Sequence, residues 1–222
     1  FLDSSTNNFT ITRNGNTTQG SFSPFSQKGW SNYFNGSSTS LTTTLASGGF
    51  GSGNFTLEYW FYPTSLYNYI TVFSTTRGAT GFNVGTDALG LLVFYSSGGR
   101  QIQGGTIIAN QWHHAAFVRN GSTLTAYLNG VSVGTATVTT NFSATAACIG
   151  ALDNGAEYIT GYVSNLRAVI GTAVYTANFT PPTAPLTAIT NTALLTCQSN
   201  RFVDNSSNAF AITANGSPSV QP

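Results

Sequence analysis

Short apolar runs separated by turn residues fill most of the chain. Runs rich in Val, Ile, Leu, Phe, Tyr and Thr predict β-strands at 55–62, 69–74, 89–95, 113–119, 123–128, 131–138, 148–150, 158–169 and 193–197. The dipeptides Asn120-Gly121 and Asn129-Gly130 separate consecutive runs, and Asn-Gly favours the tight turn of a β-hairpin. No window places apolar residues at helical spacing. The pattern therefore predicts an all-β protein, a two-sheet antiparallel jelly-roll sandwich.

The composition limits the partners of this sandwich. Only 6% of the residues are charged, and the net charge is +1 from seven Lys or Arg against six Asp or Glu. Without a basic patch the chain is not expected to bind nucleic acid, since phosphate contacts need clustered cations. No apolar run approaches the roughly 18 residues of a spanning helix, so membrane insertion is not expected either. Ser, Thr, Asn and Gly replace the missing charges on the predicted surface.

The two ends of the chain carry the same motif. Residues 1–15 read FLDSSTNNFTITRNG, residues 202–216 read FVDNSSNAFAITANG, and nine of the fifteen positions are identical at a constant offset of 201. This similarity predicts a tandem array with a period of 201 residues, in which neighbouring copies of the repeat are partners. The alternative is one domain whose first and last strands are similar.

A Pro-rich stretch suggests a domain edge. Residues 180–185 read TPPTAP, and such a segment is extended and stiff. The sequence predicts a module over 1–187, followed at 188–222 by a linker and the first strand of the next repeat. In the alternative, the last residues fold back and complete this module.

Several motifs resemble one family of sandwiches. The early strand FTLEYWFYP at 55–63, the hairpin QWHHAAFVRNG at 111–121 with LTAYLNG at 124–130, and the late strand GYVSNLR at 161–167 are similar to laminin-G-like, concanavalin A-like lectin/glucanase modules. The segments GTAVYTANFTPP at 171–182 and LLTCQ at 194–198 resemble modules of marine bacteriophage tail-fibre and structural proteins. The resemblance implies the jelly-roll fold and a role at an extracellular or virion surface.

The expected function is non-catalytic adhesion within a repeated fibre or filament, by binding carbohydrate such as a cell-surface glycan. The alternative is a structural repeat that builds a filament or spacer by self-association. Enzymes are disfavoured because glycoside hydrolysis needs two carboxylates roughly 5 to 10 Å apart, and no two acids stand at i and i+2 on a strand.

A sugar site would combine aromatic rings with amide and hydroxyl groups at one rim. The residues that could supply them are Tyr67, Asn68, Tyr69, Tyr95, Asp153, Asn154 and Tyr158. Aromatic side chains at strand spacing are otherwise core residues, and this alternative stays open here.

No cofactor is required, but Ca²⁺ is a possible one, because laminin-G-like modules often bind this ion at one rim. Asp87 and Asp153 are the candidate ligands, and the alternative is that both are turn residues. The two cysteines, Cys148 and Cys197, permit one disulfide or two buried thiols.

Overall fold

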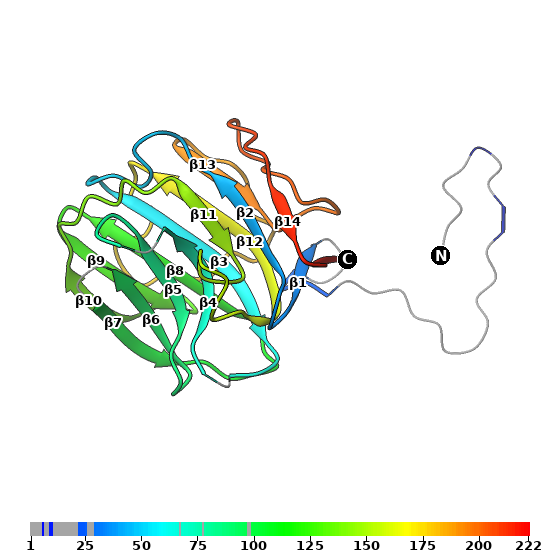
Figure 1. The fold of residues 1–222 in the computed structure, drawn as a ribbon, viewed down its shortest axis with the longest axis horizontal. Coiled ribbons are helices and arrows are strands. Elements are labelled where there is room, and N and C mark those ends of the chain that lie inside the picture. The colour runs from blue at the N-terminus through cyan, green and yellow to red at the C-terminus, as the bar shows by residue number, and fades with distance from the viewer. Residues whose placement is uncertain are drawn as a thin grey trace.

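The structure is a computed structural model that describes residues 6, 9–10, 22–25, 29–66, 68–76, 78–96 and 99–222. These residues form two antiparallel β-sheets that face each other as a sandwich (Figure 1). No helix that could span a membrane occurs among the described residues. Tyr67 and most of the first copy of the repeat, residues 1–15, lie outside the described part of the chain.

The first sheet has eight strands in the order β10-β9-β8-β3-β12-β1-β15, with β13 also paired to β12. In chain order these strands are β1 (Ser31–Asn35), β3 (Phe55–Pro63), β8 (His113–Asn120), β9 (Thr123–Leu128), β10 (Val131–Thr137), β12 (Thr160–Ile170), β13 (Thr192–Thr196) and β15 (Ser219–Gln221).

The second sheet has seven strands in the order β14-β2-β11-β4-β5-β6-β7. In chain order they are β2 (Ser40–Thr44), β4 (Ile70–Thr75), β5 (Phe82–Thr86), β6 (Leu91–Ser96), β7 (Gly99–Thr106), β11 (Ala146–Ile149) and β14 (Thr213–Asn215). The all-β jelly-roll prediction is confirmed.

Each of the nine runs predicted from the sequence overlaps a strand. The strands that the pattern missed are short or polar: β1, β2, β5, β7, β14 and β15. β2 reads SLTTT and β7 reads GRQIQGGT, so neither offers the apolar density of a recognisable strand. They exist because their neighbours pair with them, which is a tertiary effect on a weak local preference.

Alternate side chains of the central strands fill the space between the sheets. On β3, Phe55, Leu57, Tyr59 and Phe61 all enter this core and are fully buried. A cluster of phenylalanines from both sheets packs around Phe82, with ring centroids about 5 to 6 Å apart: Phe50, Phe55, Phe73, Phe94 and Phe142. Aromatic packing therefore supplies much of the apolar burial that stabilises the sandwich.

Glycines let the two sheets meet along one edge. A Cβ on Gly104 of β7 would lie 2.1 Å from the carbonyl oxygen of Val133 on β10, and one on Gly134 would lie 2.7 Å from Ile102. β7 and β10 are the edge strands of different sheets, so the sandwich closes here only because these positions lack side chains.

The C-terminal residues pair with strands of this same chain. β13 pairs with β12, β14 with β2 and β15 with β1, so both sheets contain strands from beyond residue 187. The domain boundary at residue 187 stays a prediction, as does the alternative in which residues 188–222 complete the module. The tandem array also stays a prediction.

Candidate functional site

The outer faces of the two sheets differ in what covers them. Residues 171–191 cross the outer face of the eight-stranded sheet, where Tyr175 and Phe179 stack 3.6 Å apart over Ala116, Val118 and Tyr127. The outer face of the seven-stranded sheet instead carries two adjoining hollows. We therefore take this face as the candidate site.

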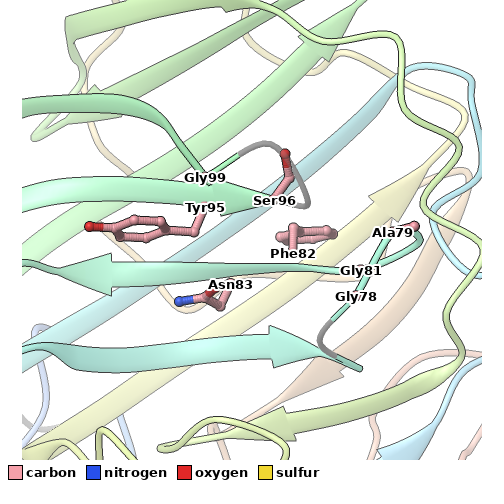
Figure 2. A pocket seen from close by; sticks show the side chains of 8 residues that line it. All are labelled: Gly78, Ala79, Gly81, Phe82, Asn83, Tyr95, Ser96 and Gly99. Atoms are coloured by element: carbon pink, nitrogen blue, oxygen red, sulfur yellow. The ribbon is translucent and has the colours of Figure 1, made fainter.

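The larger hollow measures about 520 Å³ and lies at the start of β5 and the end of β6. Figure 2 shows its lining, in which Asn83 and Tyr95 project from neighbouring strands. The full set is Gly78, Ala79, Gly81, Phe82, Asn83, Tyr95, Ser96 and Gly99. Glycines and a small alanine keep this end of the sheet low, which leaves room beside the two polar side chains.

A smaller hollow of about 190 Å³ adjoins it and is lined by Tyr69, Asn83, Tyr95 and Glu157. Asn83 and Tyr95 are direct partners across the β5–β6 ladder, and both line the two hollows. The rings of Tyr69 and Tyr95 meet edge to face at 6.4 Å. One surface therefore offers two aromatic rings, an amide and a carboxylate.

Hydrogen bonds hold the polar groups of this surface in place. The Asn83 amide donates to Thr71 Oγ1 at 3.4 Å, and Thr71 Oγ1 donates to Glu157 Oε2 at 2.9 Å. Burial, followed by the neighbouring Tyr69, raises the pKa of Tyr95, so its phenol stays neutral at physiological pH. A neutral phenol and amide suit hydroxyl-rich ligands, to which both can donate and accept hydrogen bonds.

The structure brings together part of the predicted sugar set. Tyr69 and Tyr95 line one hollow, whereas Asp153 lines a different one of about 370 Å³ beside Cys148 and Thr42. Asn68 and Asn154 are exposed in loops, and the hydroxyl of Tyr158 lies beside Gly155. None of these three lines the hollows described above, and Tyr67 lies outside the described residues.

Sequence reasoning missed Asn83 and Glu157. A signal for Asn83 existed, because Phe82-Asn83-Val84 alternates apolar and polar residues and so places the amide on the outer face. No local signal marks Glu157, which reaches Thr71 only because residues 157 and 158 bridge to β4.

Asp87 does not suit a Ca²⁺ site. Its Oδ1 accepts the backbone N–H groups of Leu89 and Leu91 at 2.9 and 3.0 Å, while Oδ2 accepts from Gln103 and lies 3.6 Å from Arg100. Asp87 is therefore a turn residue whose oxygens are occupied. No group of three or more His, Cys, Asp or Glu suited to a metal occurs among the described residues, and Ca²⁺ at Asp153 stays a prediction.

The two cysteines do not form the possible disulfide. Cys148 on β11 and Cys197 just after β13 are free thiols in different sheets, and both are buried. Burial raises the pKa of Cys197 to about 12, so this thiol is unreactive. The structure therefore matches the alternative in which both residues act as small apolar side chains.

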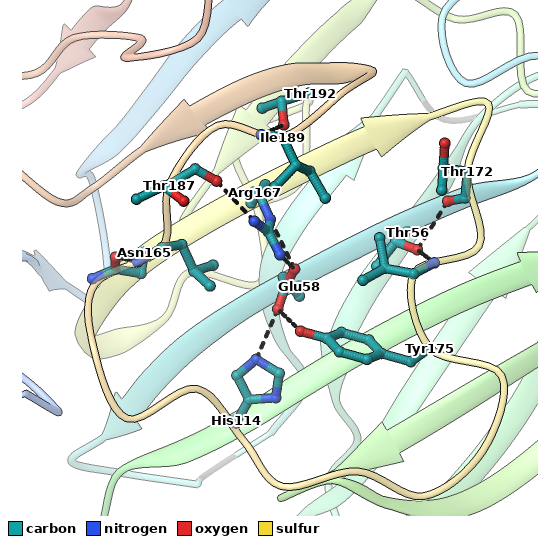
Figure 3. Close-up of polar contacts among 12 residues, drawn as sticks. Thr56, Glu58, His114, Asn165, Arg167, Thr172, Tyr175, Thr187, Ile189 and Thr192 are labelled. Carbon is teal, nitrogen blue, oxygen red and sulfur yellow. Dashed lines mark hydrogen bonds and ion pairs between the residues drawn. The ribbon is translucent and has the colours of Figure 1, made fainter.

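A second polar cluster lies beneath residues 171–191, centred on Glu58 of β3 (Figure 3). Arg167 donates to Glu58 Oε1 at 2.6 and 2.9 Å, and Tyr175 donates to Oε2 at 2.8 Å. His114 Nε2 lies 3.2 Å from the same Oε2. Glu58 and His114 are fully buried, so this carboxylate binds the crossing segment to the sheet and is closed to a substrate.

The two ring nitrogens of His114 have different surroundings. Nε2 lies within hydrogen-bond distance of Glu58 Oε2, while the buried Nδ1 has no hydrogen-bond partner among the described residues.

The Glu58 cluster makes stability depend on acid. Burial alone raises the pKa of Glu58, but the hydrogen bond from His114 and the charge of Arg167 hold it below its ordinary value of 4.5. A carboxylate with a lowered folded pKa stabilises above its unfolded pKa, and this stability is lost as pH falls through the folded pKa. We expect Glu58→Gln to flatten the decline in melting temperature between pH 5 and about pH 3. An unchanged slope in Glu58→Gln would contradict this prediction.

The solved structures with a similar fold include three that are described below. A native heptameric SAP-like pentraxin from Limulus polyphemus aligns with a TM-score of 0.62 and 15% identity, over 87% of this chain and 95% of that one. A putative carbohydrate binding protein from Bacteroides ovatus ATCC 8483 aligns with a TM-score of 0.68 and 15% identity, over 86% of this chain and 59% of that one. Domains LG4-5 of the mouse laminin alpha1 chain align with a TM-score of 0.50 and 15% identity, over 67% of this chain and 44% of that one. At these identities the similarity establishes the fold.

No curated protein matches the sequence. Residues 34–172, which are more than half of the chain, match a laminin G-type family described as the concanavalin A-like lectin/glucanases superfamily. This range runs from β1 past the end of β12 and includes both hollows. The chain therefore belongs to the concanavalin A-like lectin/glucanase superfamily.

Proposed function

We propose that the chain is a non-catalytic carbohydrate-binding module that recognises a neutral, hydroxyl-rich glycan through the outer face of its seven-stranded sheet. The observation that carries this proposal is the pair of adjoining hollows that share Asn83 and Tyr95. Aromatic rings pack on the apolar faces of sugars, and fixed amide and hydroxyl groups select their orientation. The similar Bacteroides protein is described as a putative carbohydrate binding protein, which agrees with this assignment.

The acids of this surface support binding without catalysis. Among the described residues that line the two hollows, Glu157 is the one carboxylate, and hydrolysis of a glycosidic bond needs two. Glu58 and Asp87 are buried with their oxygens in hydrogen bonds to protein groups. The proposed setting is an extracellular protein or a virion surface, as the resemblance to phage tail-fibre modules suggests.

Removing the shared ring should abolish most of the sugar affinity. We expect Tyr95→Ala to weaken binding at least tenfold (~1.4 kcal/mol), because it deletes the ring common to both hollows. Tyr95→Phe should keep most of the affinity, since the ring stays. An array of neutral and sialylated oligosaccharides would identify the binder, and titration calorimetry with that sugar would measure the variants.

The matched control is Tyr33→Ala, which removes a tyrosine of β1 that contacts Tyr162 and lines neither hollow. Equal affinity of Tyr95→Ala and the wild type, with both proteins folded, would rule out this surface as the sugar site. An array without any saturable binder would favour the second candidate function, a structural repeat that builds a filament. The observation behind that candidate is the motif shared by residues 1–15 and 202–216.

A further inference from the structure

Residues 202–216 dock on the module through a dense set of contacts. The carboxylate of Asp204 accepts four hydrogen bonds of 2.8 to 3.0 Å, from the backbone N–H groups of Leu195, Ser206 and Phe210 and from the Ser206 hydroxyl. Ser206 and the amide of Asn208 both donate to Ala193 O. Asp204 is buried, so these bonds hold the segment against β13.

The rest of the segment continues onto the other sheet. Phe202, Phe210 and Ile212 pack against the core. Thr213 and Asn215 pair with Thr42 and Ser40 of β2, and the Asn215 amide donates to Thr42 Oγ1 at 3.1 Å. Gly216 has a φ of +68°, and a Cβ there would lie 2.5 Å from Ser38 O, so this position requires glycine.

The nine positions that residues 1–15 share with this segment are the positions that make the contacts. They are Phe202, Asp204, Ser206, Asn208, Phe210, Ile212, Thr213, Asn215 and Gly216, matched by Phe1, Asp3, Ser5, Asn7, Phe9, Ile11, Thr12, Asn14 and Gly15. Of the six positions that differ, all but Val203 are exposed in the docked segment. One difference even favours the first copy: Ala209 has a φ of +48°, and its counterpart Asn8 tolerates that conformation better than alanine.

The connection to the module also has the right length. Six residues, 217–222, lead from Gly216 to the C-terminal end of β15, where Pro222 O accepts the N–H of Phe22. Six residues, 16–21, separate Gly15 from Phe22. Residues 16–21 placed along the path of 217–222 would run antiparallel to β1 and then connect to Phe22, as in a β-hairpin.

We propose that the surface formed by β2 and β13 is a docking site with two alternative occupants from the same chain, Phe202–Gly216 and Phe1–Gly15. When the first segment docks, the second is released. This inference is independent of sugar binding and has a separate readout.

A double-mutant cycle on the full chain tests the exchange. If the two occupants are equivalent, losing either one lowers the folding equilibrium constant about twofold, so Asp3→Ala or Asp204→Ala should each shift the melting temperature by less than about 2 °C. The double variant has no intact occupant and should melt about 10 °C lower, because the four bonds to the carboxylate are lost in both segments. The matched control, Asp204→Ala with Ser4→Ala, should behave like Asp204→Ala, since the counterpart of Ser4 is the exposed Asn205.

A large shift in Asp204→Ala alone, with the effects of the two substitutions simply adding, would overturn the proposal. Substitutions of residues that share no partner have additive effects on stability. The proposal therefore predicts a non-additive effect of the two substitutions on the melting temperature.

Disulfide trapping identifies the occupant and its source. In a Cys148→Ala background, Thr42→Cys with Thr213→Cys reports the segment seen in the structure, and Thr42→Cys with Thr12→Cys reports the first copy. We expect both engineered pairs to form disulfides within a monomer, and Asp204→Ala to increase the first-copy disulfide at least several-fold.

Two outcomes of the trapping experiment would overturn the proposal. In one, the Thr213→Cys pair forms its disulfide and the Thr12→Cys pair does not. In the other, the disulfide of the Thr12→Cys pair occurs only in covalent dimers, which would show that the occupant comes from a second copy.

Discussion

Glu58→Gln is expected to lower the free energy of unfolding by about 3 to 5 kcal/mol, the usual cost of breaking a buried ion pair. The carboxylate accepts from Arg167, His114 and Tyr175, and Glu58 has no exposed surface. The amide of glutamine has one acceptor oxygen and adds two donors, so at least one of these donors would lose its partner. Arg167 would also remain buried without an opposite charge.

We expect the loss of stability to loosen residues 171–191 in particular. Tyr175 binds Glu58 directly, and Arg167 donates to Thr187 O at 2.8 Å, so the cluster fixes this segment at two points. We expect Glu58→Gln to increase amide hydrogen exchange there as well as to lower the urea midpoint. The double variant Glu58→Leu with Arg167→Leu should be less destabilised than the sum of the single variants, because it leaves no unpaired buried charge.

Asp153→Asn is the control, since it removes an exposed carboxylate and should change stability by no more than about 0.5 kcal/mol. A Glu58→Gln protein that unfolds at the wild-type urea concentration would show that the cluster contributes no net stability.

Arg119→Leu is expected to lower the free energy of unfolding by about 3 kcal/mol or more. The guanidinium is fully buried and donates to the carbonyl oxygens of Gly51, Gly53 and Thr140, each at 2.7 Å. It also lies over the rings of Phe55 and Phe142, about 5 Å from their centroids. Leucine keeps part of the apolar bulk but removes all three hydrogen bonds from the charged guanidinium, each worth about 1.5 to 3 kcal/mol before relaxation.

Arg119→Lys separates charge from shape. Lysine retains the positive charge but lacks the planar fork that reaches three carbonyls at once, so we expect an intermediate loss. Arg201→Leu is the control because Arg201 is exposed. Chemical denaturation measures all three variants, and an Arg119→Lys protein as stable as the wild type would show that charge alone is sufficient.

The sequence predicted the strands whose signal is local. Alternation and Asn-Gly turns indicated β8, β9 and β10 with their two hairpin turns, because adjacent strands and tight turns depend on residues close together in the chain. Density of apolar and aromatic residues indicated β3 and β12. The sequence pattern did not predict the polar strands β2 and β7, because their formation depends on pairing with strands far away in the chain.

The candidate site was predicted only in part, for a similar reason. Tyr69 and Tyr95 could be named as aromatic residues near turns, but their meeting depends on the pairing of β4 with β5 and β5 with β6. Asp153 carried the same kind of local signal, yet the fold places it at a different hollow. Local sequence supplies residue types, and strand order decides which of them meet.

The Glu58 cluster shows what the tertiary structure alone decided. Strict alternation along β12 from the core residue Val163 would point Arg167 into the core, but a bulge between Ser164 and Arg167 shifts the register, and Asn165 there has a φ of +52°. Leu166 and Ala168 then enter the core and Arg167 reaches Glu58 on the outer face. The sequence by itself determined the all-β class, the hairpins, the low charge and the repeated terminal motif, because these follow from composition and short-range pattern. The bulge, the buried charges, the free thiols and the docking of residues 202–216 were decided by long-range packing, because they depend on contacts between segments far apart in the chain.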